Sequence, residues 1–100
     1  MKFWIDDIRP APDGYIWCKS VTDAKIYITY YVRYKKDNIE IIDIDHDAGD
    51  YAKDVGDYIK ILDWMEMMGY SPNAIHIHSM NPVGVKNMRR IIRKNGWTEI

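Results

Sequence analysis

The chain has 100 residues, of which 47% are hydrophobic, and this length and composition predict one domain, residues 1–100, with its own core. The formal net charge of -1 excludes a protein coated with basic residues, although it allows a local basic face. The single cysteine excludes an intramolecular disulfide. The sequence has no run of the roughly 18 apolar residues that span a bilayer and no secretory signal pattern, so we expect a cytoplasmic protein without membrane contact.

Apolar and turn-forming residues divide the first part of the chain into short elements. Residues 2–5 predict a strand, and residues 8–14 contain two prolines and a glycine, which predict a loop. Residues 15–19 have the aromatic and β-branched composition of a second strand. Ser20 then begins a predicted helix, whose apolar residues recur at helical spacing until the polar residues 35–38.

Strands and helices alternate in the rest of the chain. Residues 39–45 predict a third strand, residues 57–69 a helix, and residues 74–80 a fourth strand. Residues 81–96 predict a last helix with proline near its start, and residues 97–100 a fifth strand. This order predicts a mainly parallel five-stranded sheet with right-handed crossovers.

Acidic residues follow two of these strands. Asp6 and Asp7 end the first strand, and Asp43, Asp45 and Asp47 occupy alternate positions in and after the third. Ligands of parallel sheets gather at the carboxyl ends of the strands, and crowded carboxylates raise one another's proton affinity unless a cation offsets them. We therefore predict a Mg²⁺ or Mn²⁺ site with Asp6, Asp7 and Asp45 as ligands.

Two of these assignments have simpler alternatives. Asp6 and Asp7 could instead start a turn by accepting backbone hydrogen bonds, although both acids leave the strand together, which favours the metal site. Asp43 lies deeper in its strand, and we expect it to be ion-paired or hydrogen-bonded rather than to take part in the chemistry.

All three histidines lie beside predicted strand ends. His76 is the deepest, and we expect it to be structural. His78 lies next to the strand end and is better placed for proton transfer. His46 faces away from Asp45 in a regular strand, but a bend could bring it over the site. The predicted catalytic residues are Asp45, His46 and His78, which would suit hydrolysis of a phosphate ester.

The last helix adds an anion site and a basic surface. Its first turn offers backbone N–H groups and the positive end of the helix dipole. The predicted phosphate-binding residues are Arg9, Ser79, Asn81 and Gly84. The basic residues of this helix form either a solvated face or a track for a polynucleotide backbone, and both interpretations stay open. The residues predicted to contact RNA are Lys86, Arg89, Arg90 and Arg93.

The acids and Ser79 resemble the pattern of response-regulator receiver domains, which have a flavodoxin-like fold and bind Mg²⁺ through those acids. The segments WIDDIRPAPDGYIWCKS, DIDHDAGD, GDYI and HIHSMNPVGVKNM further resemble the cyclic-phosphate processing receiver-like family, over nearly the whole chain. The resemblance implies a three-layer α/β/α sandwich that processes a cyclic phosphate, such as a 2′,3′-cyclic phosphate on an RNA end or a small cyclic nucleotide. It places Asp6, Asp7 and Asp45 at the metal and His46, His78, Ser79 and Asn81 around the phosphate.

The sequence departs from the receiver pattern in two places. Signalling receivers have a lysine at the end of the fifth strand, and residues 97–100 contain none, which weakens the interpretation as a phosphoaspartate switch. Residues 8–14 are also fewer than the roughly dozen that a parallel connection needs, so we expect the first helix to be missing and the second strand to pair irregularly or lie away from its usual place.

The preferred hypothesis is a metal-dependent phosphoesterase that opens a cyclic phosphate. The alternative is a non-catalytic module, either a receiver that accepts phosphate on Asp45 or a domain that binds a cyclic nucleotide. A third possibility is an interaction domain that uses its basic helix on RNA.

Overall fold

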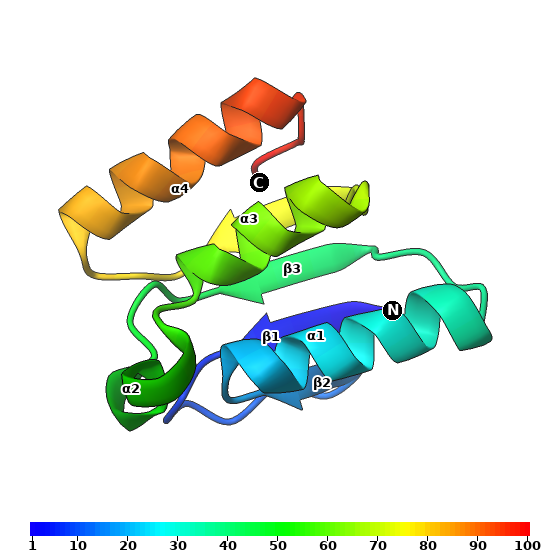
Figure 1. Cartoon of the computed structure of the whole chain (residues 1–100), viewed down its shortest axis with the longest axis horizontal. Coiled ribbons are helices and arrows are strands. Elements are labelled where there is room, and N and C mark those ends of the chain that lie inside the picture. Colours follow the sequence, from blue (N-terminus) through cyan, green and yellow to red (C-terminus); the bar gives the residue numbers. More distant parts are fainter.

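Parallel strands form the sheet of the computed structural model, which describes residues 1–53 and 55–100 (Figure 1). Neighbouring strands lie in the order β2 (Tyr15–Cys18), β1 (Lys2–Ile5), β3 (Ile41–Ile44) and β4 (Ala74–Ile77), and every pair is parallel. The central strands β1 and β3 therefore end at the same edge of the sheet as β4.

Residues 97–100 do not form the expected fifth strand. They make one isolated parallel bridge to β4, between Ile75 and Glu99. The N–H of Trp97 still donates to Ile92 O at 3.0 Å and so helps to end the last helix, which leaves three residues to run beside β4. The prediction of a five-stranded sheet was wrong, since the described part of the chain contains four strands.

The three long helices begin and end near the residues predicted for them. Ser20 caps α1 (Val21–Thr29) by accepting the N–H of Asp23 at 3.0 Å, and a π-helical turn, Tyr30–Tyr34, continues this helix. The helices α3 (Ile59–Met68) and α4 (Pro82–Asn95) both end at glycines with positive φ, 72° and 68°. Two short elements were not predicted, the 3₁₀ turn Gly49–Tyr51 and α2 (Ala52–Val55).

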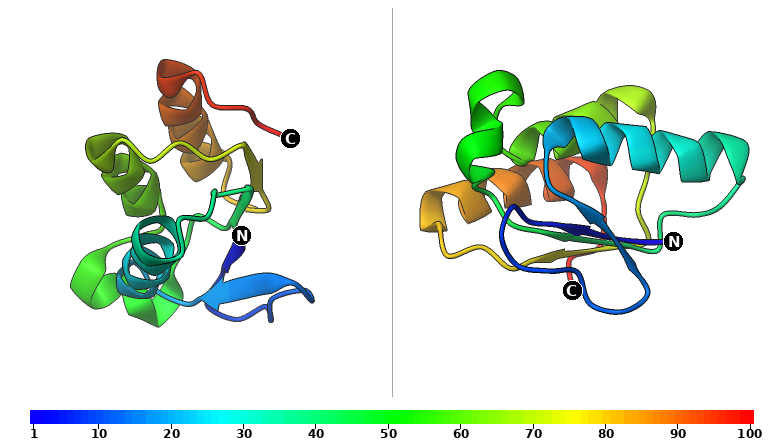
Figure 2. Two further views of the ribbon diagram at one scale, coloured as in Figure 1. Left: turned by 90° about the vertical axis from the view of Figure 1, so that its right-hand side faces the viewer. Right: turned by 90° about the horizontal axis from the view of Figure 1, so that it is seen from below.

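All the helices lie on one face of the sheet, as Figure 2 shows from two directions. The crossovers from β2 to β3 and from β3 to β4 run the same way along the sheet, so right-handed connections put their helices on the same side. The connection from β1 to β2 runs the opposite way and would cover the other face, but it contains no helix. The three-layer prediction was therefore wrong: the described residues form two layers.

The short connection nevertheless leaves β2 regularly paired with β1, with Lys2 beside Tyr15 and Ile5 beside Cys18. The missing first helix is confirmed, whereas the expected irregular or displaced second strand was wrong. Two indole N–H groups hold the connecting loop: Trp4 Nε1 donates to Arg9 O and Trp17 Nε1 donates to Asp6 O, both at 2.8 Å. The loop and these aromatic rings take the place of a helix on this open face of the sheet.

The core lies between the sheet and its helices. Alternate strand residues, such as Phe3, Ile5 and Ile42, are fully buried and face α1, α3 and α4. In the described part of the chain, no helix is both long enough and apolar enough to cross a membrane.

Cys18 is expected to be almost unreactive in the folded protein. Its side chain is completely buried, and burial raises the pKa of the thiol to about 12. An aromatic disulfide reagent should therefore label Cys18 only as fast as the protein unfolds, and labelling should become complete in denaturant. Rapid labelling of the native protein would contradict this packing.

Candidate functional site

Asp6 follows β1 and is almost completely buried, with 1% of its surface exposed. Its Oδ1 accepts the backbone N–H groups of Ile8 and Arg9, both at 2.9 Å, so this residue does start a turn. Its Oδ2 faces His78 Nε2 at 2.9 Å. Burial raises the pKa of Asp6, but the two backbone N–H groups and His78 together lower it below its ordinary value.

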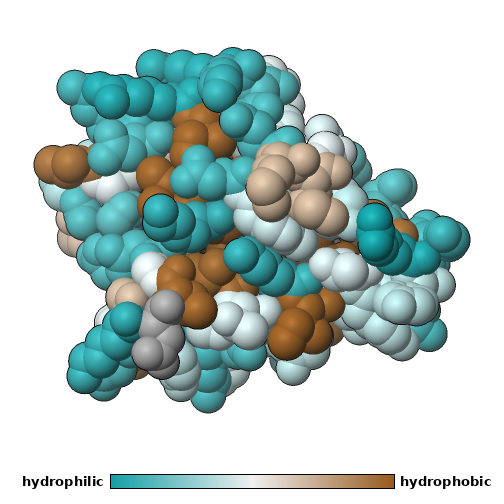
Figure 3. All heavy atoms as spheres, in the orientation of Figure 1, coloured by the Kyte–Doolittle hydropathy of each residue, from teal (hydrophilic) through white to brown (hydrophobic). Residues whose placement is uncertain are grey.

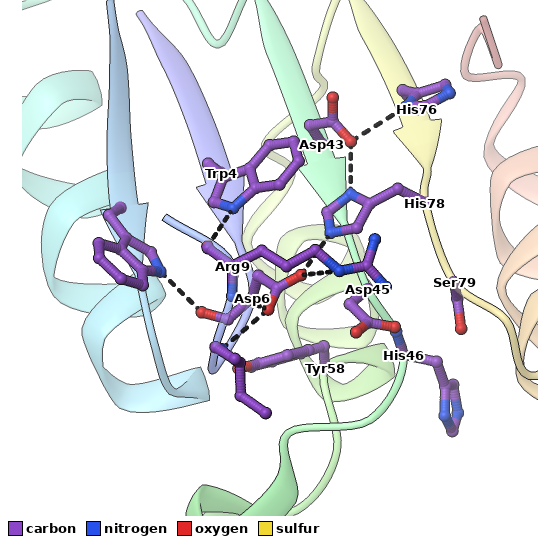
Figure 4. A network of polar contacts seen from close by, with 12 residues as sticks. Trp4, Asp6, Arg9, Asp43, Asp45, His46, Tyr58, His76, His78 and Ser79 are labelled. Carbon is purple, nitrogen blue, oxygen red and sulfur yellow. Dashed lines mark hydrogen bonds and ion pairs between the residues drawn. The ribbon is translucent and has the colours of Figure 1, made fainter. Parts of the chain in front are cut away.

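His78 lies between two carboxylates (Figure 4). Its Nδ1 is 2.6 Å from Asp43 Oδ1, and its Nε2 faces Asp6 Oδ2, so each ring nitrogen faces a carboxylate acceptor, a geometry that favours the doubly protonated imidazolium. Burial lowers the pKa of His78, but the bonds to Asp43 and Asp6 raise it above its ordinary value. The indole of Trp4 stacks on the ring at 4.2 Å and 6° and fixes its plane. Two carboxylates and one indole therefore fix the orientation of the His78 ring at the sheet edge.

Asp43 is ion-paired, as expected, and its partners are two histidines. The same oxygen that contacts His78 lies 3.0 Å from His76 Nδ1. Burial raises the pKa of Asp43, but the two imidazole contacts bring it below its ordinary value. The expected depths of the histidines are reversed, because 47% of the His76 side chain is exposed against 9% for His78. His76 stands on the open face, whereas Trp4 covers His78.

Asp45 completes a group of three ligating side chains. One ligand atom each from Asp6, Asp45 and His78 lies within 4.8 Å of the others. Asp45 Oδ1 accepts the N–H of His46 at 2.7 Å, while its second oxygen receives no hydrogen bond from the described residues. Asp7 stands beside this group but does not belong to it. Burial and the charges of Asp6 and Asp45 raise the pKa of Asp7.

These residues fit a divalent cation. Two carboxylates and an imidazole converge at the carboxyl edge of the sheet, with a third carboxylate beside them. Burial is the main cause of the raised pKa of Asp7, and the negative charges of Asp6 and Asp45 raise it further. Arg9 reaches in from the β1–β2 loop, with its Nε 3.9 Å from Asp6 Oδ2, and its side chain is half exposed (Figure 4). Oxygen ligands of this kind suit Mg²⁺ or Mn²⁺.

His46 belongs to a different part of the surface. Its side chain is directed away from Asp45, as a regular strand requires (Figure 4). Its Nδ1 lies 2.8 Å from Asp47 Oδ1, and its ring lies against the backbone of Gly84 in the first turn of α4. The His46 contact is the main factor that lowers the pKa of Asp47.

Asn81 and Ser79 build the start of α4. Asn81 Oδ1 accepts the N–H of Gly84 at 3.0 Å, and its Nδ2 donates to Asp47 at 3.2 Å. Ser79 Oγ accepts the N–H of Asn81 at 3.1 Å. The structure thus uses both side chains in capping, and it groups them with His46 and Gly84 rather than with Asp6 and His78.

Gly84→Ala should have opposite effects on stability with and without the His46 ring. A Cβ at Gly84 would collide with this ring, so the single substitution is expected to destabilise the protein by about 1–3 kcal/mol. In a His46→Ala background the clash disappears, and alanine should stabilise the helix by up to about 1 kcal/mol. Urea unfolding of the four proteins of this cycle measures both values. Equal effects in the two backgrounds would contradict the contact.

The basic residues of α4 are partly neutralised. Arg89 Nε donates to both carboxylate oxygens of Glu99, at 2.9 and 3.1 Å, and Lys94 pairs with Glu66 at 3.0 Å. Figure 3 shows a mostly hydrophilic surface where α4 lies, at the top of the molecule. The remaining predicted RNA contacts, Lys86, Arg90 and Arg93, are exposed.

In a comparison with protein families, residues 1–94 match the family described as the cyclic-phosphate processing receiver domain. Comparisons with curated proteins and with solved structures gave no match.

Proposed function

Because the chain belongs to the family of cyclic-phosphate processing receiver domains, we propose that it hydrolyses a cyclic phosphate with the help of a divalent cation. The observation that supports this proposal most strongly is the convergence of Asp6, Asp45 and His78 at the carboxyl edge of the sheet. This arrangement combines ligands for a cation with an imidazolium that can give up a proton.

In this proposal, the acidic side chains hold the cation at the side of the site that faces the substrate. Asp6 and Asp45 would hold Mg²⁺ or Mn²⁺, with Asp7 beside them, and such an ion supplies positive charge that polarises phosphoryl oxygens and acidifies water. The two N–H bonds to Asp6 Oδ1 keep its other oxygen turned toward the site. Asp45 keeps one oxygen available for an ion or a substrate, because that oxygen receives no hydrogen bond from the described residues.

His78 and Arg9 have the roles of moving a proton and binding the phosphate. Water adds to phosphorus, one of the two ring P–O bonds breaks, and the departing sugar oxygen takes a proton from His78. The proton lost by the water restores the imidazolium, so the net change is one water consumed. Asp43 and Trp4 hold the ring in place, and Arg9 offers its charge to the phosphate at the exposed side.

A ³¹P NMR time course of 2′,3′-cyclic AMP tests the proposal. We expect a monophosphate signal that needs both the protein and Mg²⁺ or Mn²⁺, and its chemical shift identifies the bond that breaks. A short RNA ending in a cyclic phosphate, run in parallel, separates an RNA substrate from a free nucleotide. Cyclic-phosphate signals that persist in both samples would overturn the proposal.

The second candidate is a receiver that accepts phosphate on Asp45. One Asp45 oxygen receives no hydrogen bond from the described residues, and its place directly after the central strand β3 favours this candidate. Incubation with acetyl phosphate followed by intact mass measurement distinguishes the two functions. A stable added phosphate that disappears in Asp45→Asn supports the receiver, and an unchanged mass together with turnover of the cyclic phosphate supports the phosphoesterase.

A further inference from the structure

A second cluster of ligating side chains lies on the open face of the sheet, on the other side of the His78 ring from Asp6. One ligand atom each from Asp43, His76 and His78 lies within 4.8 Å of the others, and Asp43 Oδ1 is 3.0 Å from His76 Nδ1 and 2.6 Å from His78 Nδ1. Asp43 and His76 are register partners on β3 and β4, and His78 follows two residues later on the same face (Figure 4). The paired strands themselves therefore hold the three side chains together.

The hydrogen bonds between Asp43 and the two histidines are of a kind that a metal ion can replace, with the ion taking the place of the histidine protons. One carboxylate oxygen faces two imidazole nitrogens, at 3.0 and 2.6 Å, and each nitrogen must carry a proton to make its bond. Tetrahedral zinc ligands stand about 2.0–2.2 Å from the metal and so roughly 3.3 Å from one another. A metal ion that displaces both protons would therefore lengthen each of the two Asp43 contacts by less than about an ångström.

The side chains around His78 are typical of a histidine that binds a metal ion. His78 donates its other N–H to Asp6 Oδ2 at 2.9 Å, and a carboxylate in this position fixes the ring and makes the ligating nitrogen more basic. Trp4 fixes the plane of the same ring. His76 is half exposed, so an ion has access from solvent and its remaining coordination positions are open to water.

We propose that Asp43, His76 and His78 form a transition-metal site of the Zn²⁺ class. Two imidazole nitrogens and one carboxylate oxygen favour Zn²⁺, Co²⁺ or Ni²⁺ over the Mg²⁺ that suits the acidic group. His78 would bind through Nδ1 and keep its Nε2 proton directed at Asp6, so it joins two sites that select different ions. Binding of the ion does not require the proposed hydrolysis, but an ion on Nδ1 would take the place of one of the two protons of the His78 imidazolium that the hydrolysis uses.

Titration of the metal-free protein with Co²⁺, followed by visible absorption and then by competition with Zn²⁺, tests the proposal. We expect one Co²⁺ per chain, not displaced by a millimolar excess of Mg²⁺, and a loss of affinity of more than about tenfold in His76→Ala. His76 is exposed, so this variant should fold, which circular dichroism verifies. Asp45→Asn should bind Co²⁺ like the wild type, even though it is expected to lose hydrolysis.

Three results would overturn the proposal. The first is unchanged affinity in folded His76→Ala. The second is loss of binding in His46→Ala, which would assign the ion to a third group with ligand atoms within 4.8 Å of one another, His46, Asp47 and Asp57. The third is a wild-type protein that takes up no Co²⁺ at submillimolar concentration, which would make the Asp43 network an ion-pair network only.

Discussion

Asp45→Asn is expected to lower the rate of cyclic-phosphate opening by more than about 100-fold, because loss of even a residue behind the metal ligands costs about 10–100-fold. Asparagine keeps the shape of the side chain and can still accept the N–H of His46, so the fold should be preserved. It lacks the negative charge that would hold the cation beside Asp6. The ³¹P NMR time course gives the rate, and circular dichroism reports the fold.

Asp63→Asn is the matched control for this variant. Asp63 is an exposed aspartate on α3, on the helical layer of the molecule, and the same change of charge there should leave the rate unchanged. Full activity of folded Asp45→Asn would remove Asp45 from the mechanism. Equal losses in both variants would point to net charge rather than to the site.

His78→Phe is expected to destabilise the protein by about 3 kcal/mol, because it leaves the buried Asp6 carboxylate without its charged partner. Phenylalanine can keep the stack on Trp4 but offers no N–H to Asp6 or Asp43. His76→Phe is the control. His76 is half exposed, and its polar contact within the described residues is with Asp43 alone, so its loss should cost less than about 1 kcal/mol. Urea unfolding in the presence of a chelator gives both values.

The loss of stability caused by His78→Phe should depend on pH in a defined direction. The pKa of His78 is raised in the folded protein, so its contribution to stability is full below about pH 6.5 and is lost as the pH rises through the folded pKa. The pKa values of Asp6 and Asp43 are lowered, so their contributions are present above about pH 4 and are lost as the pH falls through the folded values. The difference between wild type and variant should be largest between these limits. A difference independent of pH would contradict the ion-paired network.

The sequence predicted the strands and long helices well because their signals are local. Ser20, Asn81 and the helix-ending glycines Gly69 and Gly96 mark helix boundaries through bonds to residues a few positions away. The arrangement of the layers has no such local signal in the sequence. It depends on which way each crossover runs along the sheet, and the missing first helix removes a whole layer rather than one element.

The sequence could predict only which site residues lie near strand ends and which face of the sheet they share. Alternation along the strands correctly brought Asp6, Asp45 and His78 to one edge, and it turned His46 away from Asp45. It could not give the register between β3 and β4, which places Asp43 opposite His76. The stacking of Trp4 on His78 was missed for the same reason, although the indole and Asp6 share a face two residues apart.

The central place of β1 has a consequence for the order in which the chain can fold during synthesis. This strand is made first, yet it lies between β2 and β3, so it has a partner on both sides only after residue 44 has left the ribosome. Asp6 gains its side-chain partner still later in synthesis, because His78 follows it by 72 residues in the chain. The site is therefore complete only when nearly the whole domain has formed. An ion bound there would raise the melting temperature of the entire domain rather than order a single loop.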